Sequence, residues 1–172
     1  MSNFRARKSA ASHKTSDATL DELDIAILRI LQHKGRATNE EVGDAVGLSP
    51  SAASRRIHSL EERGIITGYQ ATVDSKALGA EITVFVRITL ERQTAAVLQA
   101  FDVRIRRCNG VISCHLMAGD YDYMLQVKVA DIMDYERFHQ QELSRLPGVR
   151  RIESSFAVRN VFERELDIRD PS

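Results

Sequence analysis

The sequence predicts an α+β protein in which a helical N-terminal unit precedes a unit of strands and helices. Apolar residues recur at three- and four-residue spacing between residues 20 and 64, which predicts amphipathic helices, the first over residues 20–33. From residue 82 onward, stretches of alternating apolar and polar residues predict strands, with helical stretches between them. The chain has 172 residues, 43% of them hydrophobic, which is enough for two small domains with cores.

Residues 38–64 predict two short helices joined by a tight turn. Thr38 followed by Glu41 fits a capping box, in which two side chains satisfy the free backbone donors of a helix start. Gly47 permits the positive φ that ends a helix. Ser49 suits the N-cap of the next helix, and the proline after it suits the first helical position.

The second of these helices has two different faces. Ala53, Ile57 and Leu60 lie on one side at helical spacing, and small polar and basic residues lie on the other. Such a face fits a helix that enters the major groove of DNA, although a solvated helical hairpin is the plainer alternative. The predicted DNA-binding residues are Ser49, Ser51, Ser54, Arg55, Arg56, His58, Ser59 and Arg63, and Arg56 is expected at a phosphate.

Composition divides the chain into four parts. Residues 1–18 are polar and basic and predict a disordered tail, either a solvated end or an arm that follows DNA phosphates. Residues 19–73 predict a winged helix-turn-helix domain, because residues 65–73 look like a strand after the second helix of the motif. Residues 74–80 form a linker, and residues 81–172 form the second domain.

The second domain predicts a ferredoxin-like βαββαβ arrangement, an antiparallel sheet with both helices on one face. The expected order is strand 82–90, helix 94–107, strands 111–118 and 123–129, a helix from Ile132, and strand 149–158. The more apolar set of alternate residues should form the core, namely Val84, Val86, Ile88, Ile112, Cys114, Leu116, Leu125, Val127, Ile152 and Phe156. Phe85, Met117 and Met124 then lie on the open face, which suggests an interface between two copies of the chain.

The loop Gly119-Asp120-Tyr121-Asp122-Tyr123 joins two of these strands. Glycine and aspartate favour turns, so a plain hairpin explains the loop. The same carboxylates and free backbone N–H groups also suit a small zwitterion, since a carboxylate pairs with an ammonium group. On the second interpretation Asp122 is the key side chain, and only one of the two tyrosine rings faces the ligand.

Composition also limits the functional classes. The 24 basic and 24 acidic residues cancel, so any DNA-binding charge is local. Two cysteines are too few for a disulfide framework, and neither a signal peptide nor a membrane span is recognisable, so a cytoplasmic protein is expected. Cys108, Cys114 and His115 are a weak metal site, and no nucleophile–base spacing indicates an enzyme or a cofactor.

The helix-turn-helix stretch 47–64, the segment 65–69, the loop 119–123 and the run 146–149 together resemble the Lrp/AsnC family of transcriptional regulators. The resemblance implies a winged helix-turn-helix head, a ferredoxin-like effector and assembly domain, homodimers and often octamers. It also implies binding of double-stranded DNA, and of an amino acid or related molecule between subunits near the loop. Positions that affect the amino-acid response in the leucine-type member fall on Leu116, Asp122, Ile132, Ser155, Phe156 and Ala157. Asp122 matches that member, whereas Ser155 and Phe156 differ, which leaves the effector open.

The same sequence leaves two other functional classes open. A sirohaem-decarboxylase-like enzyme shares the two-domain plan of the family, but such an enzyme needs histidines that line a tetrapyrrole pocket. Of the five histidines, only His115 is expected on an open sheet face. An architectural DNA-compacting protein without an effector fits the sequence nearly as well as a regulator, and a ligand-induced change in the DNA footprint separates the two.

Overall fold

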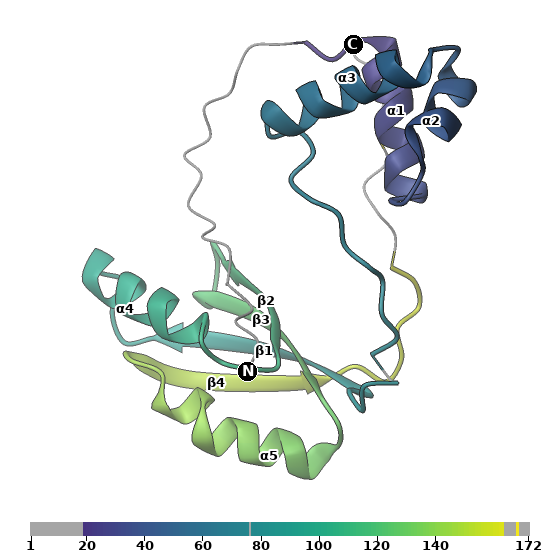
Figure 1. The fold of residues 1–172 in the computed structure, drawn as a ribbon. Coiled ribbons are helices and arrows are strands. Elements are labelled where there is room, and N and C mark those ends of the chain that lie inside the picture. The colour runs from purple at the N-terminus through teal and green to yellow at the C-terminus, as the bar shows by residue number, and fades with distance from the viewer. Residues whose placement is uncertain (1–18, 76, 164–167, 169–172) are drawn as a thin grey trace, which may run out of the picture. The chain divides into compact units, whose positions relative to one another are not determined.

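The computed structural model describes residues 19–75, 77–163 and residue 168 of the chain (Figure 1). The predicted tail of residues 1–18 lies outside the described residues. The chain divides into two compact units, and the second of them is Thr72–Glu163. We call the helical unit of residues 19–71 the head and Thr72–Glu163 the sheet unit. Within the described residues, no helix has both the length and the apolar character that a bilayer crossing requires.

The head consists of α1 (Glu22–His33), α2 (Asn39–Val46) and α3 (Pro50–Glu62). The predicted capping box is confirmed, because Thr38 and Glu41 exchange both hydrogen bonds at the start of α2. Gly47 ends α2 at φ 73°, and Ser49 caps α3 by accepting the backbone N–H of Ala52. The buried core of the head consists of Ile27, Leu31, Val42, Ala53, Ile57 and Leu60.

The predicted wing strand is not present. No residue from 65 to 73 belongs to a strand in the described structure, and Ile65 and Ile66 instead pack against the head core. A strand requires a hydrogen-bonded neighbour, and the alternation in this segment has no second segment of the head to pair with. The apolar side chains of Ile65 and Ile66, which suggested a strand, therefore cover part of the three-helix core.

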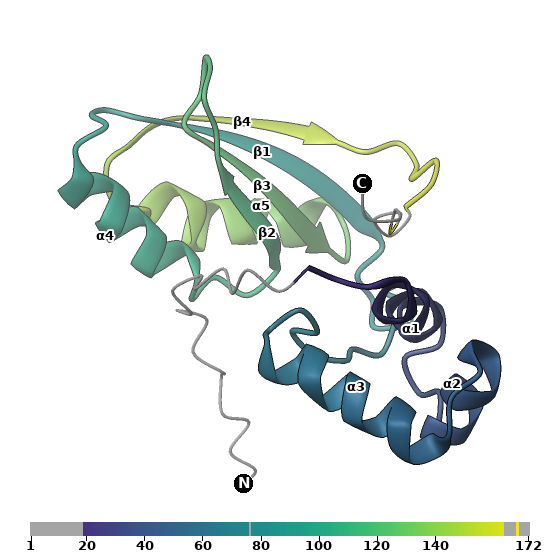
Figure 2. The ribbon, with the colours of Figure 1, turned by 90° about the horizontal axis from the view of Figure 1, so that it is seen from above.

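The sheet unit has the predicted βαββαβ order. Its elements are β1 (Ile82–Leu90), α4 (Ala95–Ile105), β2 (Val111–Leu116), β3 (Tyr123–Val129), α5 (Ile132–Gln141) and β4 (Val149–Phe156), with a short 3₁₀ helix at Leu143–Arg145. The four strands form one antiparallel sheet in the order β2-β3-β1-β4. Figure 2 shows α4 and α5 on the same face of this sheet, as the ferredoxin-like prediction requires.

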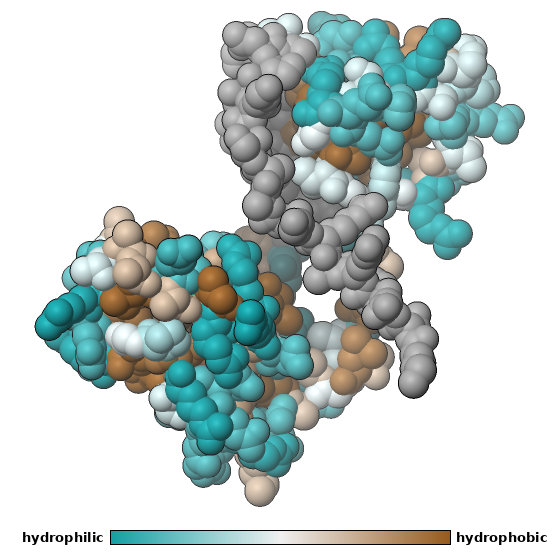
Figure 3. Space-filling model, turned by 60° about the vertical axis from the view of Figure 1, so that its left-hand side comes forward, coloured by the Kyte–Doolittle hydropathy of each residue, from teal (hydrophilic) through white to brown (hydrophobic). Residues whose placement is uncertain are grey.

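The predicted core of the sheet unit is correct for the central strands and wrong at the edges. Val84, Val86, Ile88, Leu125 and Val127 are fully buried on β1 and β3. On the outer strands the prediction fails for Ile112, Cys114, Leu116 and Phe156, which are exposed, whereas Ile152 of β4 is half-buried and packs against the core. An edge strand has a neighbour on one side only, so its apolar residues receive less cover. Figure 3 shows hydrophobic atoms reaching the surface of the sheet unit.

The open face of the sheet carries the residues expected there. Phe85 is 42% exposed and Met117 is 39% exposed. Phe85 lies opposite Gln126 on β3 and Ser155 on β4, which places all three side chains on the same face. A cavity of about 640 Å³ lies over this face, bordered by Phe85, Gln126 and residues of the segments before β1 and after β4.

Candidate functional site: the recognition helix and the effector region

The outer face of α3 is polar, small and accessible. Ser49, Ser51, Arg55, His58 and Ser59 are exposed and Ser54 is half-buried, while the apolar side of α3 fills the head core. The Arg55 guanidinium makes no hydrogen bond or ion pair with another described residue, so its five donors are available to a partner.

The charge on this face changes sign along α3. His58 lies beside two carboxylates, with its ring nitrogens 3.8 Å from Glu61 and 3.3 Å from Glu62. The available positive charge therefore lies in the N-terminal half of the helix, at Arg55. That half also carries the free N–H groups and positive dipole end that favour phosphate.

Two of the predicted DNA-binding arginines face the other way. One Arg56 nitrogen lies 2.8 Å from an oxygen of Asp21 and 2.7 Å from an oxygen of Asp24. Arg63 lies 3.5 Å from the second oxygen of Asp24. The Arg56 guanidinium is thus bonded to α1 and its N-cap, and the prediction that Arg56 contacts a phosphate stays a prediction. In the sequence, Asp21 and Asp24 indicated only a favourable helix start, since a partner 32 or 35 residues away leaves no local pattern.

The ion pairs also shift the acid–base behaviour of this cluster. The pKa of Asp21 is lowered, chiefly because its side chain accepts the backbone N–H of Asp24 and also the Arg56 guanidinium. The pKa of Arg56 is raised by its hydrogen bonds to the two aspartates. Both shifts favour the charged forms of Asp21 and Arg56.

Asp122, in the loop of residues 119–123, makes its hydrogen bonds within the sheet unit. It is buried, and one carboxylate oxygen accepts the backbone N–H of Leu90 at 2.6 Å. The other oxygen accepts the side-chain amide of Gln93. Both oxygens of Asp122 thus have protein partners, which gives this side chain a structural role, and its predicted pairing with a ligand ammonium group stays a prediction. Gly119 and Asp120 of the same loop are exposed.

The two tyrosines of the loop differ as expected. Tyr123 is buried, stacks on Phe101 with ring centroids 4.2 Å apart, and donates its hydroxyl to Asp102. Its pKa is raised, first by burial and then by the Asp102 carboxylate. The Arg87 guanidinium carbon lies 5.8 Å from the centroid of the Tyr121 ring, and Tyr121 is half-buried. Of the two tyrosines, Tyr121 is therefore the more exposed.

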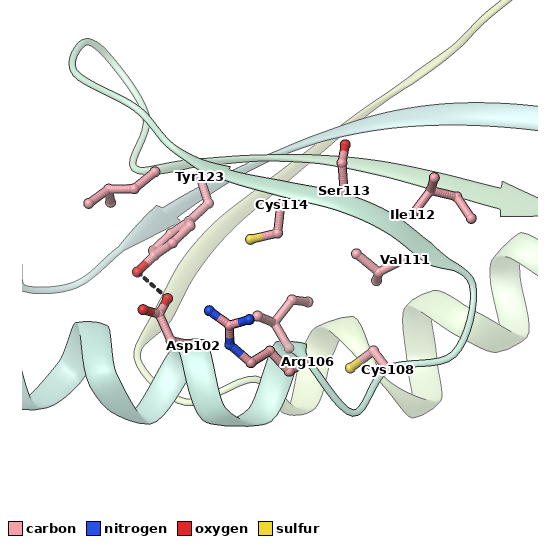
Figure 4. Close-up of a pocket in the computed structure, with 10 residues that line it drawn as sticks. Asp102, Arg106, Cys108, Val111, Ile112, Ser113, Cys114 and Tyr123 are labelled. Carbon is pink, nitrogen blue, oxygen red and sulfur yellow. Dashed lines mark hydrogen bonds between the residues drawn. The ribbon is translucent and has the colours of Figure 1, made fainter. Parts of the chain in front are cut away.

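A cavity of about 320 Å³ lies between α4 and the edge strand β2 (Figure 4). Leu116, Cys114 and Tyr123 line it, and Asp102 and Arg106 contribute charged groups that the sequence analysis did not single out. Burial raises the pKa of the Cys114 thiol to about 11, so the thiol is protonated at neutral pH. Asp102 and Arg106 lie four residues apart on α4, a spacing that would have shown them on one helix face.

The remaining predicted effector residues lie elsewhere in the sheet unit. Ile132 is the exposed first residue of α5. Ser155 and Phe156 are on β4, the edge of the sheet opposite to β2, and Ala157 follows them. The Phe156 ring contacts Tyr135 of α5 edge-on. One copy of the chain therefore does not gather Leu116, the loop and the β4 residues into a single pocket.

The cysteines do not form a metal centre with their neighbours in the described part of the chain, where no group of three or more potential ligands occurs. The Cys108 thiol donates to Glu142 and to the backbone carbonyl of Arg104. Burial, together with Glu142, raises its pKa to about 11. Cys108 thus joins α4 to the segment after α5 as a neutral, buried group.

Comparison with known proteins agrees with this two-unit organisation. Residues 20–61 match the AsnC-type helix-turn-helix domain, and residues 83–166 match the Lrp/AsnC ligand binding domain. The Bkd operon transcriptional regulator of Pseudomonas aeruginosa is 42% identical over 147 residues, covering 86% of this chain and 96% of that protein. The leucine-responsive regulatory protein of Escherichia coli is 39% identical over 138 residues, covering 80% and 84%.

Solved structures give the same result. A transcriptional regulator of Neisseria meningitidis, solved as its L-methionine complex, has a TM-score of 0.80 at 33% identity and covers 84% of this chain and 94% of its own. A feast or famine regulatory protein of M. tuberculosis complexed with L-methionine has a TM-score of 0.79 at 31% identity, covering 88% and 100%. With a helix-turn-helix domain and a ligand-binding domain both matched in order, the chain belongs to the Lrp/AsnC family of transcriptional regulators.

Proposed function

We propose that this regulator binds specific double-stranded DNA through the outer face of α3. The observation that carries the proposal is the Arg55 guanidinium, which has no partner among the described residues and lies among exposed serines, on a helix whose opposite side is fixed in the head core. Arginine reads guanine through two parallel hydrogen bonds, and small hydroxyl side chains let the helix approach the base edges closely. Ser51, Ser54, Arg55, His58 and Ser59 are the residues we assign to this contact.

The open face of the sheet supports a homodimer, and further association into an octamer is compatible with the exposed sheet edges. Phe85 is apolar and exposed, and its register with Gln126 and Ser155 places it on the face of the sheet that neither helix covers, while Met117 just after β2 is exposed as well. A two-fold dimer presents two heads to a palindromic site, which explains how a chain without net charge gains DNA affinity. Phe85→Glu places a charge in this contact, and we expect a smaller mass by light scattering after size-exclusion chromatography. A variant with the wild-type mass contradicts this interface.

An amino acid is the effector class that the relatives support, since two of the similar structures contain L-methionine. The exposed Asp120 carboxylate, the half-buried Tyr121 ring and the exposed backbone at Gly119 suit a zwitterion. Asp122 is better explained as the residue that holds this loop, because it bonds Leu90 and Gln93. Leu116 and the β4 residues lie on opposite edges of the sheet, so a site that uses both needs a second copy of the chain.

Gel-shift titration of a duplex from the region upstream of its own gene tests the whole proposal. The titration is repeated with each of the twenty amino acids and with a scrambled duplex of equal composition. We expect preference for the upstream duplex and a shift in affinity or in the banding pattern with one or a few amino acids. Equal binding to both duplexes contradicts specific recognition. Specific binding that no amino acid alters favours an effector-independent architectural role.

A further inference from the structure

A cluster of four charged side chains joins α1 to α3 on the side of the recognition helix away from its exposed face. Asp24 is its centre, and only 9% of its side chain is exposed. One of its oxygens lies 2.7 Å from Arg56, and the other lies 3.5 Å from Arg63. Asp21 bonds the same Arg56 nitrogen, but half of its side chain is in solvent.

Apolar contacts alone leave the rotation of α3 about its own axis poorly determined. Ile57 and Leu60 pack against Ile27 and Leu31 of α1, and such non-directional contacts tolerate small rotations. Hydrogen-bonded charges are directional, and the Asp24 carboxylate bonds Arg56 on α3 and pairs with Arg63 at the C-cap of α3, about two turns further along. Arg55 lies about 100° from Arg56 around the helix axis. The hydrogen bonds of Arg56 therefore also fix the direction in which the Arg55 side chain leaves the helix.

We infer that Asp24 is a positioning residue for DNA recognition, which holds through Arg56 and Arg63 the rotation of α3 that presents Arg55 to the bases. This inference rests on the proposed function, because it assumes that α3 reads DNA. It gives Arg56 and Arg63 a role in specificity without contact with DNA. The inference involves no basic residue of α1, such as Arg29.

Electrostatics and positioning predict opposite signs for the removal of this carboxylate. DNA is strongly anionic, so the loss of a negative charge from the head strengthens binding to any sequence if charge alone matters. If Asp24 positions α3, its loss weakens binding to the specific site and leaves non-specific binding equal or stronger. The ratio of the two affinities therefore separates the two explanations.

The test uses Asp24→Asn, which keeps the size of the side chain, and fluorescence anisotropy with the upstream duplex and its scrambled counterpart. Asp21→Asn is the matched control, because it removes the same charge from the same cluster and asparagine remains a good N-cap. We expect Asp24→Asn to lower the specific-to-nonspecific ratio at least tenfold and Asp21→Asn to change it less than threefold. A ratio in Asp24→Asn that equals or exceeds the wild-type ratio overturns the inference.

A second variant covers the case in which Asp24→Asn destabilises the head. Arg56→Lys keeps the charge but replaces the rigid planar guanidinium, one nitrogen of which bonds both aspartates, with a compact ammonium group on a flexible stem. We expect a lower specific affinity with an unchanged dependence on salt concentration, since no phosphate contact is lost. Wild-type specificity in Arg56→Lys, or a reduced salt dependence, contradicts positioning. If the wild-type protein itself does not distinguish the two duplexes, the proposed function fails and this inference fails with it.

Discussion

The head and the sheet unit differ in the size of their cores. In the described residues, the sheet unit has a core cluster of 14 buried residues, whereas the head has one of six. Both units use side-chain N-caps, at Asp21, Thr38 and Ser49 in the head and at Thr94 and Asp131 in the sheet unit. The head adds the ion pairs of Asp24 between α1 and α3, so the unit that we propose to read DNA joins its helices through directional polar contacts as well as through a small apolar core.

The largest effect we expect is in the core of the sheet unit. Phe101 of α4 is fully buried and stacks on Tyr123, so Phe101→Ala should lower the free energy of unfolding of this unit by about 3–5 kcal/mol. Hydrogen exchange followed by mass spectrometry should show faster exchange in β1, β3 and α4 and unchanged protection in α1–α3. Equal loss of protection in both units contradicts separate cores.

In the sheet unit, the buried carboxylate of Asp122 tests how much a polar interaction contributes to the free energy of unfolding. Asp122→Ala leaves the buried N–H of Leu90 without an acceptor, which should cost about 1–3 kcal/mol of the free energy of unfolding in urea titrations. Asp120→Ala is the matched control in the same loop, and because Asp120 is exposed we expect a change below about 0.5 kcal/mol. Similar losses in the two variants mean that the Asp122 bonds contribute no net stability.

In the head, the polar interaction to test is the capping box formed by Thr38 and Glu41. Thr38→Ala removes the acceptor for the Glu41 N–H and should lower the free energy of unfolding of the head by about 1 kcal/mol. Thr38→Ser retains the hydroxyl and should remain close to wild type. Thermal unfolding followed by the helical circular dichroism signal measures both. If the two variants melt at the same temperature, the cap does not stabilise α2.

The smallest effect that we expect is on the stability of the head at acidic pH. The pKa of Glu41 is lowered in the folded head, first by its hydrogen bond from Lys34 and then by the backbone N–H of Thr38. Folding therefore favours the ionised carboxylate, and the resulting stability is present above the unfolded pKa and lost as the pH falls through the lower folded pKa. Melting temperatures between pH 6 and pH 3 should fall less steeply in Glu41→Gln than in wild type. Identical slopes contradict a contribution from Glu41.

Local features of the chain were predicted well from the sequence. The capping box at Thr38 and Glu41, the left-handed turn at Gly47 and the bounds of β1 and β3 all follow from patterns within a few residues. The ferredoxin-like order followed from the succession of such patterns. The division of roles between Tyr121 and Tyr123 followed from their alternation around Asp122.

The errors share one physical cause, which is that they depend on distant partners. Alternation marks Ile112 and Leu116 as apolar but does not say that β2 is an edge strand. The segment 65–73 has strand-like residues but no strand beside it. The sequence also did not show the protein partners of Asp122 and Arg56, because each finds them across more than 25 residues of sequence.

The most direct test of the account is the sequence preference of Arg55→Ala. Anisotropy titrations of the wild type and the variant, each with the upstream and the scrambled duplex, give the free-energy difference between specific and non-specific binding. Because Arg55 is the free guanidinium on the face of α3, we expect its loss to reduce this difference by about 1–3 kcal/mol. An unchanged difference in Arg55→Ala contradicts recognition of DNA by this face of α3.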